Sequence, residues 1–180
     1  NWAPRIEPNG YYEYFCGTAP TNHIYGLRKA LDIILSEGMT SVLARHAVLA
    51  KAVWTAVERW GQDGGLLKMN ISKPQDRSHA VTALSIGAPD AKRLRHWVEK
   101  NAGLTLGIGL GMASEEDPNG DGFFRLGHMG YVNAQMIMGM LGTIETGLIA
   151  LDIAHGSGAC EAAAKKLALS VKTSNFEGLR

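Results

Sequence analysis

Apolar residues recur at helical spacing through the first third of the chain. From about Asn22, a stripe of apolar residues falls on one face of a helix that we expect to end at Gly38. The stripe comprises Ile24, Leu27, Leu31 and Ile34. A second helix is predicted from an N-cap at Thr40 to Gly61, with an apolar face formed by Leu43, His46, Ala50, Val53, Val57 and Trp60. Because His46 lies on this face, we expect a packed, hydrogen-bonded histidine rather than a metal or catalytic ligand.

After residue 61 the pattern changes to short apolar runs bounded by turn residues, which are typical of strands. They cover 65–72, 80–87, 104–111 and 122–128. Between the second and third runs, Asp90 can cap a helix whose inward positions are Leu94, Trp97 and Val98. Its basic residues are expected to form a solvated face: Lys92, Arg93, Arg95 and Lys100. A long helix is predicted from about Asn133, followed by a short one at 158–169. The long helix carries a stripe of Ile137, Met140, Ile144, Leu148 and Leu151.

The order of these elements predicts an α+β fold: a small, mostly antiparallel or mixed sheet with helices on one face. The other face of such a sheet is open to solvent or to a larger partner. Residues 1–20 contain three of the six prolines and several aromatic residues, which favours an extended arm over a helix. We therefore expect an interface arm at 1–20 and one small domain at 21–180.

Composition and charge narrow the class of protein. The formal net charge is +1, which argues against a nucleic-acid-binding protein, since that class needs a basic face. The chain opens at Asn1 without a basic-then-apolar leader, so we expect a fragment without a signal peptide and a cytoplasmic location. The apolar run 134–154 contains Gln135, Glu145 and Asp152, which are costly in lipid, so it predicts a buried helix and no membrane association. Cys16 and Cys160 are predicted to be reduced thiols.

The segment Asp117–His128, DPNGDGFFRLGH, begins like an EF-hand calcium loop. Acidic or amide side chains lie at 117, 119 and 121, and a glycine follows at 122. The match then fails, because the position of the bidentate glutamate is His128 and the ninth position is Arg125. The sequence therefore predicts a turn joining two strands and no metal site.

Other common sites are also disfavoured. The run GIGLGM has Met112 where a dinucleotide-binding loop needs its third glycine. No two of the six histidines are closely spaced and there is no Cys-x-x-Cys motif, so a zinc site is not expected. The sequence around Ser157 is HGSGA, which is not a G-x-S-x-G nucleophile motif.

Arg125 is the remaining candidate. It lies on an apolar strand between Phe124 and Leu126 and is followed by the glycine-framed GHMG. A guanidinium in such surroundings needs an anionic partner. The residues alone leave two interpretations: a carboxylate or phosphate ligand, or a structural ion pair with an Asp or Glu of the protein.

Three stretches closely resemble the C-terminal part of class V (fold-type I) pyridoxal-phosphate aminotransferases, and among these the alanine–glyoxylate and serine–glyoxylate (serine–pyruvate) branch. They are GTAPTNHIYGLRKALDIILSEG (17–38), RHAVLAKAVWTAVERWG (45–61) and FFRLGHMGYVNAQMIMGMLGTIETGL (123–148). The resemblance covers essentially the whole chain in the same order, and the Arg-Leu-Gly-His-Met-Gly strand and the Thr-containing arm are its more specific parts.

The resemblance implies roles for two residues. Arg125 matches the arginine that holds the α-carboxylate of the amino or keto acid by two hydrogen bonds. Thr18 matches the threonine that reaches across a homodimer interface to the phosphate of the partner's pyridoxal 5'-phosphate. Some relatives place a tyrosine three residues before this threonine, whereas the chain has Phe15, which lacks the hydroxyl.

The resemblance also implies that the catalytic large domain is absent from the chain. In the family that domain supplies the Schiff-base lysine and the aspartate at the pyridine nitrogen, and the lysines here match neither position. We therefore expect the substrate-carboxylate-binding part of an enzyme that moves an amino group from alanine or serine to a 2-oxo acid such as glyoxylate or pyruvate. The isolated chain should be inactive, with no catalytic residue of its own. The alternative is a non-catalytic α+β module that binds a small carboxylate or a protein partner.

Overall fold

The computed structural model describes residues 18–173, which divide into two compact units at the Val42–Leu43 bond. In the first unit, α1 (Thr21–Glu37) has no buried residue. Its predicted apolar stripe exists but is exposed, with Leu27 at 59% and Leu31 at 45% exposure. Gly38 ends this helix at a positive φ of 85°, a conformation that favours glycine. Of the arm predicted at 1–20, only Thr18–Pro20 falls within the described residues.

The next helix, α2 (Met39–Trp60), begins two residues earlier than an N-cap at Thr40 predicts. Thr40 is therefore the second residue of the helix rather than its N-cap, and this prediction was wrong. The helix buries the predicted positions Ala50, Val53, Val57 and Trp60, whereas Leu43 is exposed.

The second unit, from Leu43 onward, contains a four-stranded sheet in the order β1-β2-β4-β3. The strands are β1 (Lys68–Met69), β2 (Val81–Ser85), β3 (Gly107–Ile108) and β4 (Phe123–Gly127). All three pairings are antiparallel. The predicted α+β fold class is thus confirmed, and each strand lies inside the run expected for it. The outer strands β1 and β3 are only two residues long.

The two faces of the sheet differ in burial. Residues Thr82, Leu84, Phe124 and Leu126 are buried, whereas their neighbours Val81, Ala83, Ser85, Phe123 and Arg125 are only partly buried. Successive side chains of a strand point to opposite faces, so the buried set forms one face and the second set forms the other. Arg125 therefore lies on the more open face of the sheet.

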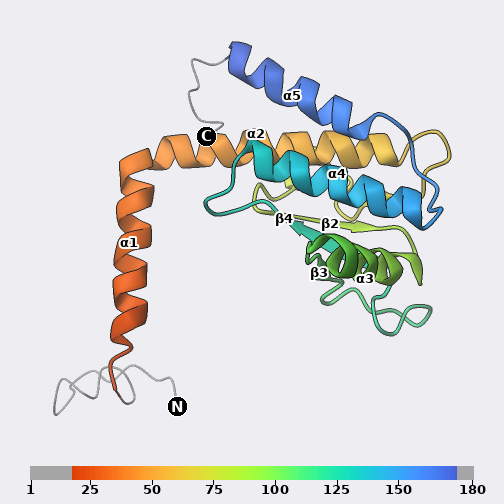
Figure 1. Cartoon of the computed structure of the whole chain (residues 1–180), viewed down its shortest axis with the longest axis horizontal. Coiled ribbons are helices and arrows are strands. Elements are labelled where there is room, and N and C mark those ends of the chain that lie inside the picture. Colours follow the sequence, from red (N-terminus) through yellow and green to blue (C-terminus); the bar gives the residue numbers. More distant parts are fainter. Residues whose placement is uncertain (1–17, 174–180) are drawn as a thin grey trace. The chain divides into compact units, whose positions relative to one another are not determined.

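The helices pack on the buried face. They are α2, α3 (Asp90–Ala102), α4 (Ala134–Ala150) and α5 (Ala159–Thr173), and a short 3-10 helix, η2 (Pro74–Asp76), follows β1. One core joins them to the sheet, with Leu94 and Val98 of α3, Ile144 and Leu148 of α4, and Ala163 of α5 all buried in it. Figure 1 shows α4 alongside α2, and the hydrogen bond from Trp60 Nε1 to Glu145 Oε1 (3.4 Å) joins these two helices.

The predicted N-terminus is confirmed for α4 but not for α3. Asn133 caps α4, because its side chain accepts a hydrogen bond from the backbone N–H of Met136, as a helix from about Asn133 requires. Asp90 does not cap α3. It is the first residue of the helix, and its carboxylate accepts from Arg93 Nη1 at 2.6 Å instead.

The predicted solvated face of α3 is also only partly correct. The side chain of Arg95 is only 13% exposed and pairs with Asp121 at 3.5 Å. Lys92 Nζ lies 2.9 Å from the other carboxylate oxygen of Asp121. These two basic residues tie α3 to the loop that precedes β4. Arg95 is mostly buried because that loop covers it. The spacing of apolar residues along α3 cannot predict such a contact.

Among residues 18–173, no single helix is both long and apolar enough to cross a bilayer. Only α1 and α2 taken together pass, and by length and composition alone.

Candidate functional site

Arg125 is the third residue of β4, and the register of the sheet places it between two small residues. Its partners are Ala83 on β2 and Gly107 on β3. Because neither neighbour has a long side chain, the guanidinium has room to lie over the sheet. The prediction that Arg125 lies on an apolar strand is confirmed.

The Arg125 side chain is fixed at one nitrogen. Its Nε donates a hydrogen bond to the carbonyl oxygen of Ile108 at 2.8 Å. In the described part of the chain, no Asp or Glu lies within ion-pair distance of Arg125, so a structural ion pair does not account for it there. The bond to Ile108 orients the planar guanidinium through Nε. The two terminal nitrogens are the pair that can bind a carboxylate in two parallel hydrogen bonds.

A cavity of about 260 Å³ opens beside this side chain. Its wall comes from β3 and the segment before it, from β4 and the residues after it, and from α4. The main wall residues are Leu104, Leu106, Gly107, Met129 and Met140. An apolar wall around one cation lowers the local dielectric and strengthens its attraction for a bound carboxylate.

The carboxylate of Asp117 holds the loop before β4 closed. The two carboxylate oxygens of Asp117 accept the backbone N–H groups of Asp121 (2.8 Å) and Gly122 (2.7 Å). The backbone N–H of Gly120 also bonds to the Asp117 carbonyl, at 3.0 Å. Asp117 therefore closes the turn that delivers β4. Within residues 18–173 there is no group of three or more His, Cys, Asp or Glu residues that could hold a metal ion.

His128 follows β4 and is fully buried. Its Nδ1 lies 3.0 Å from the carbonyl oxygen of His79, and its Nε2 lies 2.8 Å from Oγ1 of Thr82. Trp54 Nε1 donates to the same hydroxyl at 3.0 Å. Burial lowers the pKa of His128 from its usual value, and this effect exceeds the raising effect of its hydrogen bond to His79.

The backbone after His128 is held by α2. Arg45, which is buried, donates from Nη1 to the carbonyl oxygens of Gly130 (3.0 Å) and Val132 (2.8 Å). His46 Nε2 lies 3.1 Å from the same Gly130 oxygen. The predicted hydrogen bond of His46 is confirmed, although the residue is only half-buried. Arg45 and His46 together clamp the segment that joins β4 to α4.

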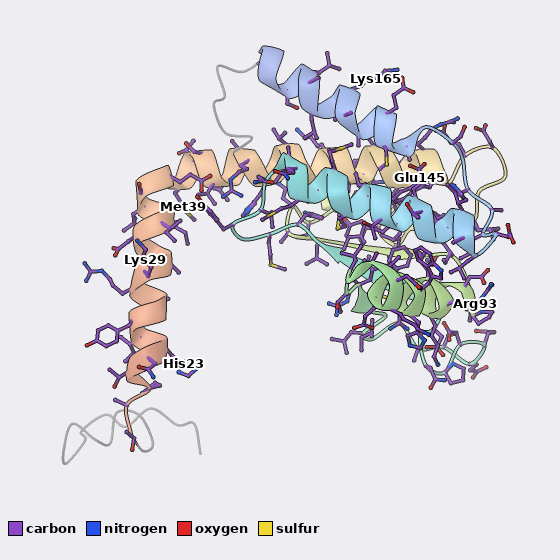
Figure 2. The ribbon with its side chains drawn as sticks, viewed as in Figure 1. His23, Lys29, Met39, Arg93, Glu145 and Lys165 are labelled. Carbon is purple, nitrogen blue, oxygen red and sulfur yellow. The ribbon has the colours of Figure 1, made fainter. Side chains whose placement is uncertain are left out.

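The other predicted residues lie away from this cavity or in the other unit. Thr18 is exposed and belongs to the first unit, and Phe15 and Cys16 lie outside the described residues. Lys68 is on β1 and Lys73 immediately precedes η2, while Lys29 and Lys165 project from helices (Figure 2).

Cys160 of α5 is a free thiol with a carboxylate neighbour. Burial and the hydrogen-bonded Glu145 raise its pKa to about 12. Figure 2 shows Glu145 on α4. A thiol with this pKa stays protonated near neutral pH, which argues against Cys160 as a nucleophile.

Sequence reasoning missed several parts of the site. The Ile108 carbonyl and the Thr82 hydroxyl carry no sequence signal, because their roles depend on strand pairing. Gly107 belongs to the run GIGLGM, whose glycines do not by themselves indicate which residue lies opposite. Arg45 had a usable signal, since an arginine next to the apolar stripe of a long helix requires a buried partner.

No family model matches the chain. It is 36% identical over 160 residues to the serine–glyoxylate aminotransferase of Methylorubrum extorquens, covering 86% of this chain and 36% of that enzyme. It is likewise 36% identical over 154 residues to the serine–glyoxylate aminotransferase of Arabidopsis thaliana, covering 83% and 35%. The chain thus spans about a third of the length of these relatives.

Solved structures of two aminotransferases share the fold of this chain. The pyridoxamine–pyruvate aminotransferase of Mesorhizobium loti superposes with a TM-score of 0.70 at 27% identity, covering 91% of this chain and 38% of that one. The ureidoglycine–glyoxylate aminotransferase of Bacillus subtilis shares the fold, with a TM-score of 0.71 at 21% identity, covering 87% and 38%. Homologues of this chain are therefore serine–glyoxylate aminotransferases, and over the third of their length that it spans the chain has the α+β fold of aminotransferase C-terminal domains.

Proposed function

We propose that this chain supplies the substrate-carboxylate-binding part of a pyridoxal-phosphate-dependent aminotransferase. The full-length enzyme moves an amino group from a small amino acid, alanine or serine, to a 2-oxo acid such as glyoxylate or pyruvate. The observation that carries the proposal is the position of Arg125: held at Nε by Ile108, beside an apolar cavity, on the more open face of the sheet. Residues 21–180 form the small domain, and residues 1–20 form an interface arm.

Arg125 performs binding and orientation in this proposal. Both partial substrates of a transaminase, the amino acid and the oxo acid, carry an α-carboxylate, so one bidentate site serves both halves of the reaction. Two parallel hydrogen bonds fix the position of the carboxylate and of the adjacent Cα, which lowers the entropy cost of reaching the reactive geometry. Gly107, opposite Arg125, leaves the space over β3 clear for the guanidinium.

The described residues around the Arg125 cavity lack the groups that bind the pyridine ring of the cofactor. The residues that line the Arg125 cavity in the described part of the chain include neither a lysine nor a carboxylate. The groups that would hold the pyridine ring belong, in this proposal, to the part of the enzyme outside this chain. Thr18 is proposed to bond the cofactor phosphate across a homodimer interface.

Substitution of Arg125 by lysine in the full-length enzyme tests the proposal. Lysine keeps the charge but cannot form two parallel hydrogen bonds, so KM should rise for both the amino donor and the oxo acceptor. kcat/KM should fall by an amount that corresponds to roughly 2–4 kcal/mol of lost transition-state stabilisation, the usual cost of disrupting a desolvated charged pair. Cofactor binding, followed by its visible absorbance, should be nearly unchanged.

The matched control is Arg93→Lys. Arg93 is an α3 arginine whose side chain is 48% exposed and pairs with Asp90, so both KM values should be unchanged. If Arg125→Lys leaves kcat/KM unchanged while lowering stability, Arg125 is a structural residue. A full-length protein without aminotransferase activity that still binds small carboxylates would favour the non-catalytic module instead.

A further inference from the structure

A network of buried polar groups runs from α2 along the helix-covered face of the sheet to the end of β4. Trp54 lies on α2, Thr82 on β2 and His128 just after β4, and the exposed fractions of the three residues are 7%, 5% and 0%. The indole N–H donates to the threonine hydroxyl at 3.0 Å, and that hydroxyl lies 2.8 Å from Nε2 of the imidazole. The imidazole ends the network at the carbonyl oxygen of His79, 3.0 Å from Nδ1.

The partners determine which imidazole nitrogen carries the proton. A carbonyl oxygen can only accept, so Nδ1 of His128 must be protonated to bond His79. In the neutral ring Nε2 then has a lone pair, which accepts the hydroxyl hydrogen of Thr82. The Thr82 oxygen in turn accepts from Trp54. With this tautomer, all three donors of the network have an acceptor: the Trp54 indole N–H, the Thr82 hydroxyl and Nδ1–H of His128. The other neutral tautomer and the imidazolium leave the Thr82 hydroxyl without an acceptor in the network. An added proton on Nε2 would point at the Thr82 oxygen and displace the hydroxyl hydrogen from its acceptor.

The network is connected to the Arg125 cavity by the backbone on either side of His128. The N–H of His128 bonds to the carbonyl of Ala80 at 2.9 Å, which extends the β2–β4 pairing one residue past Gly127. Gly127 and Met129, the two neighbours of His128 in sequence, both line the cavity. The His128 side chain points into the core, while Met129 is 51% exposed. Anchoring His128 therefore sets the position of the cavity wall on both sides of it.

We propose that His128, as the neutral Nδ1–H tautomer held by Thr82 and the His79 carbonyl, is a positioning residue for the carboxylate site at Arg125. The tautomer follows from the hydrogen-bond partners of the imidazole, whereas the role toward substrate rests on the proposed function.

The tautomer is measured directly on the 180-residue chain. Long-range ¹H–¹⁵N correlation spectra of the histidine-labelled chain at pH 7.5 distinguish the two neutral tautomers and the imidazolium, and His128→Asn identifies the His128 signals. We expect the Nδ1–H pattern. An Nε2–H pattern, or an imidazolium at this pH, would overturn the proposal without reference to any enzymatic activity.

The positioning role is tested with Thr82→Val, which keeps the shape of the side chain and removes the hydroxyl. The matched control is Thr55→Val on α2, where the half-buried hydroxyl bonds only to the carbonyl of Lys51 on its own helix. In the full-length enzyme, Thr82→Val should raise KM for both carboxylate substrates roughly 3- to 10-fold, the effect of about one lost hydrogen bond, with kcat within about twofold. Thr82→Ser restores the hydroxyl and should restore KM. Thr55→Val should leave KM unchanged.

A second readout does not require activity. The Arg125 Nε–H signal of the 180-residue chain should move in Thr82→Val and not in Thr55→Val. If Thr82→Val lowers stability but moves neither this signal nor KM, His128 only holds the fold and the proposal is wrong. If the signal moves while the full-length protein has no aminotransferase activity, the proposed function fails and the positioning role stands.

Discussion

Gly107 of β3 lies directly opposite Arg125 of β4, and a β-carbon built on Gly107 would lie 3.1 Å from Cβ of Arg125 and 3.3 Å from its Nε. Both distances are shorter than ordinary carbon contacts, so a side chain at this position would force the arginine to move. The absence of a side chain at Gly107 is thus what allows Arg125 to reach the Ile108 carbonyl.

We expect Gly107→Ala to weaken substrate binding in the full-length enzyme. The added methyl displaces the guanidinium by a few tenths of an ångström and bends the bond to Ile108, and misplacements of this kind reduce kcat/KM by roughly 3- to 10-fold. Steady-state kinetics with both substrates measures the effect. Gly139→Ala on α4, where no atom beyond its chain neighbours and its own helix backbone lies within 4 Å of the new β-carbon, is the control and should leave the kinetics unchanged. Equal kinetics for the two variants would contradict the role of Gly107.

Stability should fall as the pH falls below about 6.5, because His128 is buried in its neutral form. Burial lowers its pKa in the folded state from the ordinary value of 6.5, and the neighbouring His46 and His79 also lower it. The unfolded chain then binds a proton that the folded chain resists, so the free energy of unfolding is highest above pH 6.5 and declines down to the folded pKa. Each unit of difference between the two pKa values is worth about 1.4 kcal/mol.

Urea denaturation between pH 5 and 7.5 checks this pH dependence. His128→Asn removes the titrating group and should flatten the decline, whereas His96→Asn, on an exposed position of α3, should retain it. A wild-type curve that is flat over this range would show that His128 titrates alike in both states.

Asp117→Asn should cost about 1–2 kcal/mol in the free energy of unfolding. An asparagine has one acceptor oxygen, so it can keep only one of the two bonds to the backbone N–H groups of Asp121 and Gly122. Activity of the full-length enzyme should change little. Glu115→Gln, an exposed position in the same loop, is the control and should be neutral. Added calcium should not change the Tm of the wild-type chain, and a calcium-dependent rise would restore the EF-hand interpretation.

Cys160 should react slowly with thiol reagents. With a pKa of about 12, its thiolate fraction at pH 8 is on the order of 1,000-fold below that of an ordinary cysteine. Alkylation by iodoacetamide in a Cys16→Ser background, followed by mass spectrometry, measures the rate. Glu145→Gln removes the negative charge and should speed the reaction, while Glu161→Gln, which disrupts an exposed pair with Lys165, should not. Rapid alkylation of the background protein would contradict the raised pKa.

The 180-residue chain should not retain pyridoxal phosphate covalently. The described lysines of the second unit lie on α-helices, on β1 and before η2, and none of them lines the Arg125 cavity. After incubation with the cofactor and gel filtration, no stable visible aldimine band is expected. A stoichiometric band that disappears on substitution of one particular lysine would place the Schiff-base residue in this chain.

The sequence by itself determined the class of fold and the place of Arg125. The period of the apolar residues located α2, α3 and α4, because a helix buries every third or fourth residue against the core. The alternation around Phe124 and Leu126 put Arg125 on the opposite face of β4, because successive side chains of a strand point to opposite sides. The failed calcium pattern correctly indicated a turn at Asp117.

The tertiary structure decided everything that depends on which strands are neighbours. The pairing of β4 with β2 and β3 placed Ala83 and Gly107 beside Arg125, and gave its Nε the Ile108 carbonyl. It also brought Trp54, Thr82 and His128 into one network, although 74 residues separate the first from the last. No local pattern records such contacts, because the free energy of each depends on a partner that is distant in sequence. The burial of Arg95 and of Arg45 has the same origin, since each cation is buried only where folding supplies a carboxylate or carbonyl oxygens.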